Sequence, residues 1–160
     1  MIRVGIGYDS HRFAPPGPMI LGGVSIPAGV HLDGHSDGDA IAHALTDAVL
    51  GAMGAGDIGQ LFPDTNPRNK GRNSIEMLRM AVERVNASGW RVAQVDIVVV
   101  TEQPKIGPHR EAMSRELARA LGVKEGDVSL KGKTNEKMGW IGRGEGLACM
   151  VVATITNDER

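Results

Sequence analysis

The sequence is short of cysteine, of aromatic residues and of long apolar runs. Its single cysteine, Cys149, has no partner for an internal disulfide, which favours a reducing compartment and hence the cytoplasm. Aromatic residues make up 3% of the chain, so the core must be packed from Val, Ile, Leu, Met and Ala. No apolar stretch is long enough to span a bilayer, and residues 2–6 read as a strand, not as a signal peptide. We therefore expect a cytoplasmic protein with no membrane partner.

Charge is neither abundant nor concentrated. The formal net charge is −1 and the Lys and Arg residues are scattered, so no basic tract could follow a nucleic-acid backbone. The 160 residues suit one domain, and 41% of them are apolar, which is enough to form a core. Because no repeat or linker divides the chain, residues 1–160 are predicted to form a single domain that does not bind nucleic acid.

Strands are indicated by short segments rich in β-branched residues. Residues 19–26 predict a hairpin bent at Gly22-Gly23. Residues 91–100 end in an almost continuous run of Val and Ile, which predicts a strand covered on both faces. Three more strands are predicted over residues 2–8, 128–131 and 147–156.

Helices are indicated by apolar residues at intervals of three and four. One is predicted over residues 40–53, a second begins at Asn73 with Glu76 placed as in a capping box, and a third covers residues 108–121. Residues 57–72 are rich in Pro, Asn, Asp and Gly, which predicts a loop of unusual length. The order of elements predicts an α+β fold in two layers, with a mixed sheet and helices on one of its faces.

Three side chains form a candidate metal site. Asp9 and His11 follow the first predicted strand, and residues two apart in an extended backbone point to the same side. His43 lies in the first turn of the helix predicted over residues 40–53. Two imidazoles and one carboxylate are a common catalytic zinc set, which leaves the fourth position open for water or substrate.

Each of these residues also has a plainer interpretation. Asp9 could cap a turn, Asp37 or Asp39 could cap the helix, and His43 could be an ordinary hydrogen-bonded helix residue. The spacing by itself indicates a candidate metal site and does not establish one.

A resemblance to a known family rests on motifs that occur in order along nearly the whole chain. They are Asp9-Ser10-His11, Gly34-His35-Ser36-Asp37-Gly38-Asp39, His43-Ala44-Leu45-Thr46-Asp47, Gly56-Asp57-Ile58-Gly59, Phe62-Pro63-Asp64, Lys131-Gly132-Lys133-Thr134-Asn135-Glu136 and Gly142-Arg143-Gly144-Glu145-Gly146. With these motifs the sequence closely resembles the 2-C-methyl-D-erythritol 2,4-cyclodiphosphate synthases of non-mevalonate isoprenoid biosynthesis.

The resemblance implies a phosphorus–oxygen lyase. In this family the 2-phosphate of 4-diphosphocytidyl-2-C-methyl-D-erythritol 2-phosphate attacks the β-phosphorus, which closes a cyclic diphosphate and releases CMP. The positions matching Asp9, His11 and His43 bind one zinc ion per subunit, and the position matching Glu136 helps to hold a second divalent ion, Mg²⁺ or Mn²⁺. We expect the same metals and ligands here.

Other matching positions are implied to hold the substrate. His35 and Thr134 are expected to stabilise the phosphates as catalytic residues, residues 57–64 to hold the methylerythritol, and residues 101–107 with 133–136 to hold the cytidine. The expected substrate-binding residues are Ser36, Asp57, Ile58, Gly59, Phe62, Pro63, Asp64, Thr101, Pro104, Lys105, Ile106, Gly107, Lys133, Thr134, Asn135, Glu136, Trp140 and Arg143.

The family also implies a homotrimer with active sites between neighbouring subunits, in which Trp140 and Arg143 lie near the threefold axis. Two other functions fit the same metal ligands. A zinc-dependent phosphohydrolase would need a positioned water and would release an uncyclised product. A trimeric metal-binding protein without catalysis would not need Asp57, Thr134 or Glu136.

Overall fold

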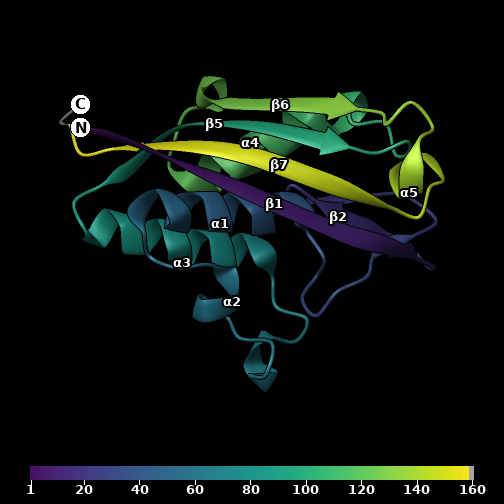
Figure 1. The fold of residues 1–160 in the computed structure, drawn as a ribbon, viewed down its shortest axis with the longest axis horizontal. Coiled ribbons are helices and arrows are strands. Elements are labelled where there is room, and N and C mark those ends of the chain that lie inside the picture. The colour runs from purple at the N-terminus through teal and green to yellow at the C-terminus, as the bar shows by residue number, and fades with distance from the viewer. Residues whose placement is uncertain (159–160) are drawn as a thin grey trace.

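The structure is a computed structural model that describes residues 1–158, and these fold into two layers (Figure 1). Within these residues one layer is a mixed sheet with the strand order β4-β1-β7-β5-β6. β7 pairs antiparallel with both β1 and β5, whereas β5 and β6 are parallel. A separate hairpin joins β2 to β3. The strands are β1 (Ile2–Ala14), β2 (Met19–Leu21), β3 (Val24–Ile26), β4 (His31–Leu32), β5 (Arg91–Val100), β6 (Val128–Lys133) and β7 (Gly146–Thr156).

Helices form the second layer and cover one face of the sheet. α1 (Ala40–Met53) packs on β1 and β7, α3 (Ser74–Ala87) packs on α1, and α4 (Arg110–Leu121) packs on α3 and β6. In Figure 1, α1 and α3 run side by side below β1, and α4 lies behind the strands. The predicted two-layer α+β fold is confirmed. The shorter elements are α2 (Ile58–Leu61), α5 (Gly139–Gly142) and 3₁₀ turns at Pro67–Asn69, Gly107–His109 and Glu125–Asp127.

Two glycines let α1 lie almost against β1. A Cβ added at Gly5 would stand 1.9 Å from the carbonyl oxygen of Ala48, and one added at Gly7 would stand 1.8 Å from that of Ala44. Only glycine permits so close an approach between the two backbones. Because His43 immediately precedes Ala44, this packing also sets the distance from His43 to the part of β1 that follows Gly7.

The ends of the main helices follow from their capping residues. Asp39 caps α1, since its side chain accepts a hydrogen bond from the backbone N–H of Ala42 at 3.1 Å. Gly54 ends α1 in the left-handed region with a φ of 64°. The helix predicted over residues 40–53 is therefore confirmed at both ends. Asn73 caps α3, as predicted, by accepting from the N–H groups of Ile75 and Glu76.

Two predicted segments differ in the structure, and one short strand was not predicted. β1 does not end near residue 8 but continues to Ala14, because its pairing with β7 runs on through His11 and Arg12. Its last residues pair with β4, a short strand that was not predicted. The loop predicted over residues 57–72 contains α2 and a 3₁₀ turn, each begun by an Asp or Asn side chain that accepts from the backbone.

Within residues 1–158, no element covers the face of the sheet opposite the helices. In β5, Val95, Ile97 and Val99 are buried, but Val98 between them is partly exposed, so the prediction of cover on both faces is wrong for this chain. The run of Val and Ile shows that both faces are apolar, not that both are covered. The exposed apolar side chains on this face come from β1 and β7 and are Ile2, Val4, Ile6, Tyr8, Met150 and Val152.

The core between the layers is aliphatic, as the scarcity of aromatic residues predicts. Its largest fully buried side chains are all Met, Leu or Ile, among them Met19, Leu45 and Met113. Within residues 1–158, none of the helices is both long and apolar enough to cross a membrane.

Candidate metal centre

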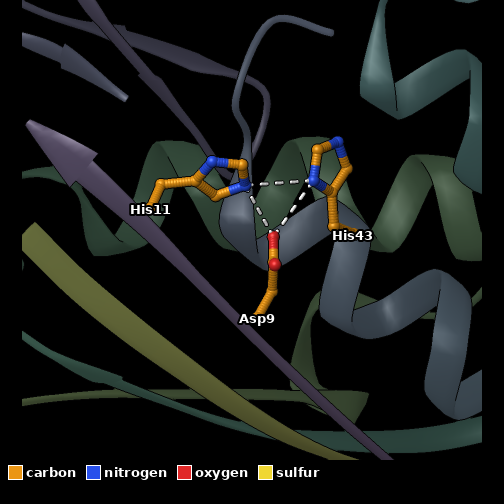
Figure 2. A group of neighbouring side chains, drawn as sticks. All are labelled: Asp9, His11 and His43. Carbon is orange, nitrogen blue, oxygen red and sulfur yellow. Dashed lines mark hydrogen bonds and ion pairs between the residues drawn. The ribbon is translucent and has the colours of Figure 1, made fainter. Parts of the chain in front are cut away.

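Asp9, His11 and His43 converge on one point between β1 and the start of α1 (Figure 2). Asp9 Oδ2 lies 2.8 Å from His11 Nε2 and 3.0 Å from His43 Nδ1, and the two ring nitrogens are 3.3 Å apart. Asp9 and His11 share the side of β1 that carries Gly5 and Gly7, so they face α1. The structure therefore brings together the three residues predicted to form the metal site.

A hydrogen bond on the side of the ring away from Asp9 fixes the orientation of His11. His11 Nδ1 lies 2.7 Å from the carbonyl oxygen of Asp33, which can only accept a hydrogen bond. Nδ1 therefore carries a proton, and in the neutral ring Nε2 offers its lone pair to the point shared with Asp9. Gly34 leaves room for the ring, since a Cβ there would stand 2.9 Å from His11 Cε1.

The charges of the cluster support one another. Burial by itself would raise the pKa of Asp9, but its interactions with the imidazoles of His11 and His43 outweigh burial and lower that pKa. Burial would likewise lower the pKa of His11, but its hydrogen bond to Asp9 and the charge of that carboxylate raise it. A cation at the centre would compete with any proton bound there.

The donor set fits a metal ion such as zinc. Two imidazole nitrogens and one carboxylate oxygen face a common point, and all three side chains are partly buried. The remaining side opens into a cavity of about 200 Å³. A three-ligand site that faces a cavity has the arrangement of a catalytic metal centre rather than a closed structural one.

That cavity contains many of the residues predicted to bind the substrate. Its lining is Asp9, His11, His35, Ser36, His43, Ile58, Gly59, Phe62, Asp64, Asn69 and Met77. Asn69 and Met77 were not predicted, and nothing in their sequence context marks them. Asp57 is not in the lining, because its side chain caps α2 by accepting from the N–H of Gln60 at 2.8 Å. Pro63 is also outside the lining.

A second cavity, also of about 200 Å³, lies at the end of β5 and β6. It collects most of the residues predicted to hold the cytidine, together with two outside the predicted ranges, Arg110 and Gly132. Its lining is Thr101, Glu102, Pro104, Lys105, Ile106, Gly107, Arg110, Gly132, Lys133 and Thr134.

Glu102 holds the turn that follows β6. Its carboxylate accepts from the N–H of Lys137 at 2.7 Å and from the N–H of Asn135 at 3.2 Å. Glu136 and Lys137 adopt left-handed φ values of 52° and 60°, which are uncommon for residues other than glycine. The Glu102 carboxylate thus stabilises the conformation that presents Glu136, a role that sequence spacing does not reveal.

The two cavities share no lining residue among those described. Thr134 and Glu136 are hydrogen-bonded to each other, from Glu136 N to Thr134 Oγ1 at 3.3 Å, and not to the metal cluster. Trp140 lies beside His11 in a third cavity, and Arg143 forms an ion pair with Glu145 at 2.8 Å. The predicted site residues therefore fall into separate groups in this chain.

Comparisons with known proteins agree with this geometry. A 2-C-methyl-D-erythritol 2,4-cyclodiphosphate synthase from Gemmatimonas aurantiaca is 63% identical over 155 residues, which cover 97% of this chain and 93% of the relative. The bifunctional IspDF of Campylobacter jejuni superposes with a TM-score of 0.93 at 41% identity, over 97% of this chain and 42% of that longer one. IspF of Plasmodium falciparum, solved as a CDP complex, gives a TM-score of 0.87 at 35% identity, over 99% and 97% of the two chains. Residues 2–156 match the sequence profile of the YgbB family, and the chain belongs to that family.

Proposed function

We propose that this chain converts 4-diphosphocytidyl-2-C-methyl-D-erythritol 2-phosphate to 2-C-methyl-D-erythritol 2,4-cyclodiphosphate and CMP. An oxygen of the 2-phosphate forms a bond to the β-phosphorus. The bond from that phosphorus to the oxygen shared with the α-phosphate breaks, and its electron pair leaves with CMP. The observation that carries the proposal is the convergence of Asp9, His11 and His43 beside a cavity, in a chain whose relatives bear this enzyme's name.

Zinc is the metal that the donor set favours, because two imidazoles and one carboxylate with an open fourth position are typical of catalytic zinc sites. When bound, it would polarise a phosphate oxygen and offset the charge that develops there. Asp9, His11 and His43 would hold it. Glu136 is proposed to help hold Mg²⁺ or Mn²⁺ on the diphosphate, since it is an exposed carboxylate two residues after Thr134, which lines the second cavity.

The chain's own side chains position the phosphates and do not need to activate a nucleophile. A phosphate monoester has a second pKa of about 6, so the attacking oxygen is already ionised at neutral pH. His35 and Ser36 line the metal cavity and can donate hydrogen bonds to phosphate oxygens, and Thr134 can do so from the second cavity. Phe62 gives the metal cavity an apolar wall suited to the methyl group of the substrate.

The second cavity is proposed to hold the cytidine and its diphosphate. Lys105 and Lys133 contribute positive charge to it, and Thr101, Ile106 and Gly107 contribute backbone groups that can recognise a base. The CDP complex of the Plasmodium falciparum relative supports a cytidine nucleotide as ligand. Glu102 is acidic but is already engaged with two backbone N–H groups, so its charge is partly offset.

A complete active site is proposed to form between two copies of the chain, in a homotrimer. Two features support this assembly. The metal cavity and the nucleotide cavity share no lining residue among those described, and the described part of the chain leaves the apolar sheet face of Val4, Ile6 and Tyr8 exposed. A cytoplasmic location is proposed as well, because Cys149 is a free, buried thiol whose pKa is raised by burial.

The test is a ³¹P NMR experiment with the diphosphocytidyl substrate, zinc and magnesium. We expect equal amounts of CMP and one cyclic diphosphate, with no inorganic phosphate. A zinc-dependent phosphohydrolase would instead release inorganic phosphate or an uncyclised diphosphate. Absence of any turnover in protein shown to contain zinc would favour a metal-binding protein without catalysis.

A further inference from the structure

The outer nitrogen of His43 contacts two hydroxyl groups. Nε2 lies 2.7 Å from Ser74 Oγ and 2.8 Å from Ser36 Oγ, while Nδ1 on the other side of the ring faces Asp9. Ser74 is the first residue of α3 and is fully buried. The start of α3 therefore meets the start of α1 at the ring of His43.

Asp37 sets the direction of these hydrogen bonds. The Ser74 hydroxyl donates to Asp37 Oδ1, and the backbone N–H of Ser74 donates to Asp37 Oδ2 at 3.1 Å. The N–H of Asp39 also donates to Oδ1, at 3.1 Å. A carboxylate only accepts hydrogen bonds, so the one hydroxyl proton of Ser74 is committed to Asp37. Towards His43, Ser74 can therefore act only as an acceptor.

This constraint selects one tautomer of the ring. In neutral imidazole one nitrogen carries a proton and the other a lone pair. Ser74 only accepts, so its contact at 2.7 Å favours a proton on Nε2 of neutral His43, with the lone pair of Nδ1 towards Asp9 and His11. The Asp9 carboxylate also only accepts and competes for that proton from the Nδ1 side, but it lies farther away, at 3.0 Å, and is shared with His11. Ser36 by itself would not select a tautomer, since its hydroxyl can either accept from Nε2 or donate to it.

We propose that Ser74 and Asp37 are positioning residues of the metal centre, which hold the His43 proton on Nε2 so that Nδ1 is free to bind the metal. The inference rests on the metal site proposed above. His11 is served in the same way by the carbonyl group of Asp33. Such outer partners of a metal-binding histidine fix its tautomer and its orientation, and their loss commonly costs about 10–100-fold in metal affinity.

The positioning role can be separated from the anchoring of α3. Ser74→Ala removes the hydroxyl but leaves the backbone N–H of Ser74 bonded to Asp37 Oδ2. Asn73 still caps the helix through Ile75 and Glu76. Ser88→Ala is the matched control, because it removes a hydroxyl at the other end of α3 that donates only to the carbonyl oxygen of Arg84.

The experiment observes the tautomer in the full chain without metal and then measures the affinity for zinc alone. Long-range ¹H–¹⁵N spectra of histidine-labelled protein, recorded at alkaline pH where imidazoles are neutral, show which nitrogen of His43 is protonated. Titration against a chromophoric chelator gives the zinc affinity. We expect protonated Nε2 in the wild type and in Ser88→Ala. In Ser74→Ala we expect mixed tautomers and zinc binding weakened by about 10–100-fold.

Two further variants keep the inference testable if Ser74→Ala does not fold. Asp37→Asn keeps the Ser74 hydroxyl but removes one acceptor oxygen, so it should shift the tautomers in the same direction. Ser74→Thr retains the hydroxyl and should restore the wild-type spectrum. Protonated Nδ1 in the wild type, or an unchanged spectrum and zinc affinity in Ser74→Ala, would overturn the inference. A wild-type protein with protonated Nε2 that binds no zinc would overturn the metal centre itself, so the two failures are distinguishable.

Discussion

Replacement of Gly7 by Ala should disrupt the metal centre from a distance, although Gly7 is not a predicted ligand. A Cβ on Gly7 would stand 1.8 Å from the carbonyl oxygen of Ala44, whereas real Cβ atoms keep at least 3.0 Å, so α1 and β1 must separate by about 1.2 Å. Ligand distances in a zinc site tolerate about 0.2 Å. His43, next to Ala44, would therefore move out of reach of a metal held by Asp9 and His11.

The expected size of the effect follows from the same contact. Overpacking costs roughly 1–3 kcal/mol, and a rigid backbone carbonyl places Gly7→Ala at the upper end. A misplacement of about 1 Å at a catalytic centre costs on the order of 100-fold in rate. Urea unfolding, zinc content and turnover measure the three consequences.

Gly51→Ala is the matched control for Gly7→Ala. Gly51 lies in α1, and an added Cβ there would meet no atom within 4 Å. The substitution should stabilise the helix by roughly 0.5–1 kcal/mol and leave zinc binding unchanged. If Gly7→Ala folded with full zinc content and wild-type turnover, the claim that this contact sets the geometry of the site would be refuted.

Three further predictions concern pH, assembly and the nucleotide cavity. Zinc affinity should fall as the pH falls through the raised pKa of His11, because a proton then competes with zinc for Nε2. Asp9 stays ionised over this range because its pKa is lowered. Calorimetry across pH tests this, and a zinc affinity that does not change with pH would count against it. Ile6 is 72% exposed in the single chain and lies in the proposed trimer interface, so Ile6→Asp would bury a charge there. Sedimentation should then show monomers, which keep zinc but lose turnover. A stable, active trimer would argue against the proposed interface. Glu102→Ala should raise KM about 10–100-fold, since a hydrogen bond to a charged group contributes about 1.5–3 kcal/mol and about 1.4 kcal/mol is tenfold. Steady-state kinetics with an unchanged KM would contradict this role.

Local signals in the sequence were sufficient for the main elements. The helix over residues 40–53 is marked by its capping Asp39, its apolar spacing and Gly54, all of which act within the helix itself. The end of β1 could not be predicted in this way. The segment after Tyr8 is polar, and it stays extended because its backbone pairs with β7, about 140 residues later in the chain.

The same distinction applies to the site. Asp9 and His11 are two residues apart, so extended backbone alone aligns them, and the family motifs indicate His43. Ser74 and Asp37 are separated by 37 positions and meet only because α3 packs beside the loop before α1. In the sequence, Ser74 is simply a residue at the start of a helix. Such partners become visible only when the hydrogen bonds of a buried ligand are followed outward.

The most direct test of the central claim is a crystal of the protein grown with zinc and measured at the zinc absorption edge. We expect an anomalous peak at about 2.0–2.2 Å from Asp9 Oδ2, His11 Nε2 and His43 Nδ1, with its fourth side towards the cavity. A zinc-containing crystal with no peak at this point, or with its peak at other side chains, would contradict the assignment.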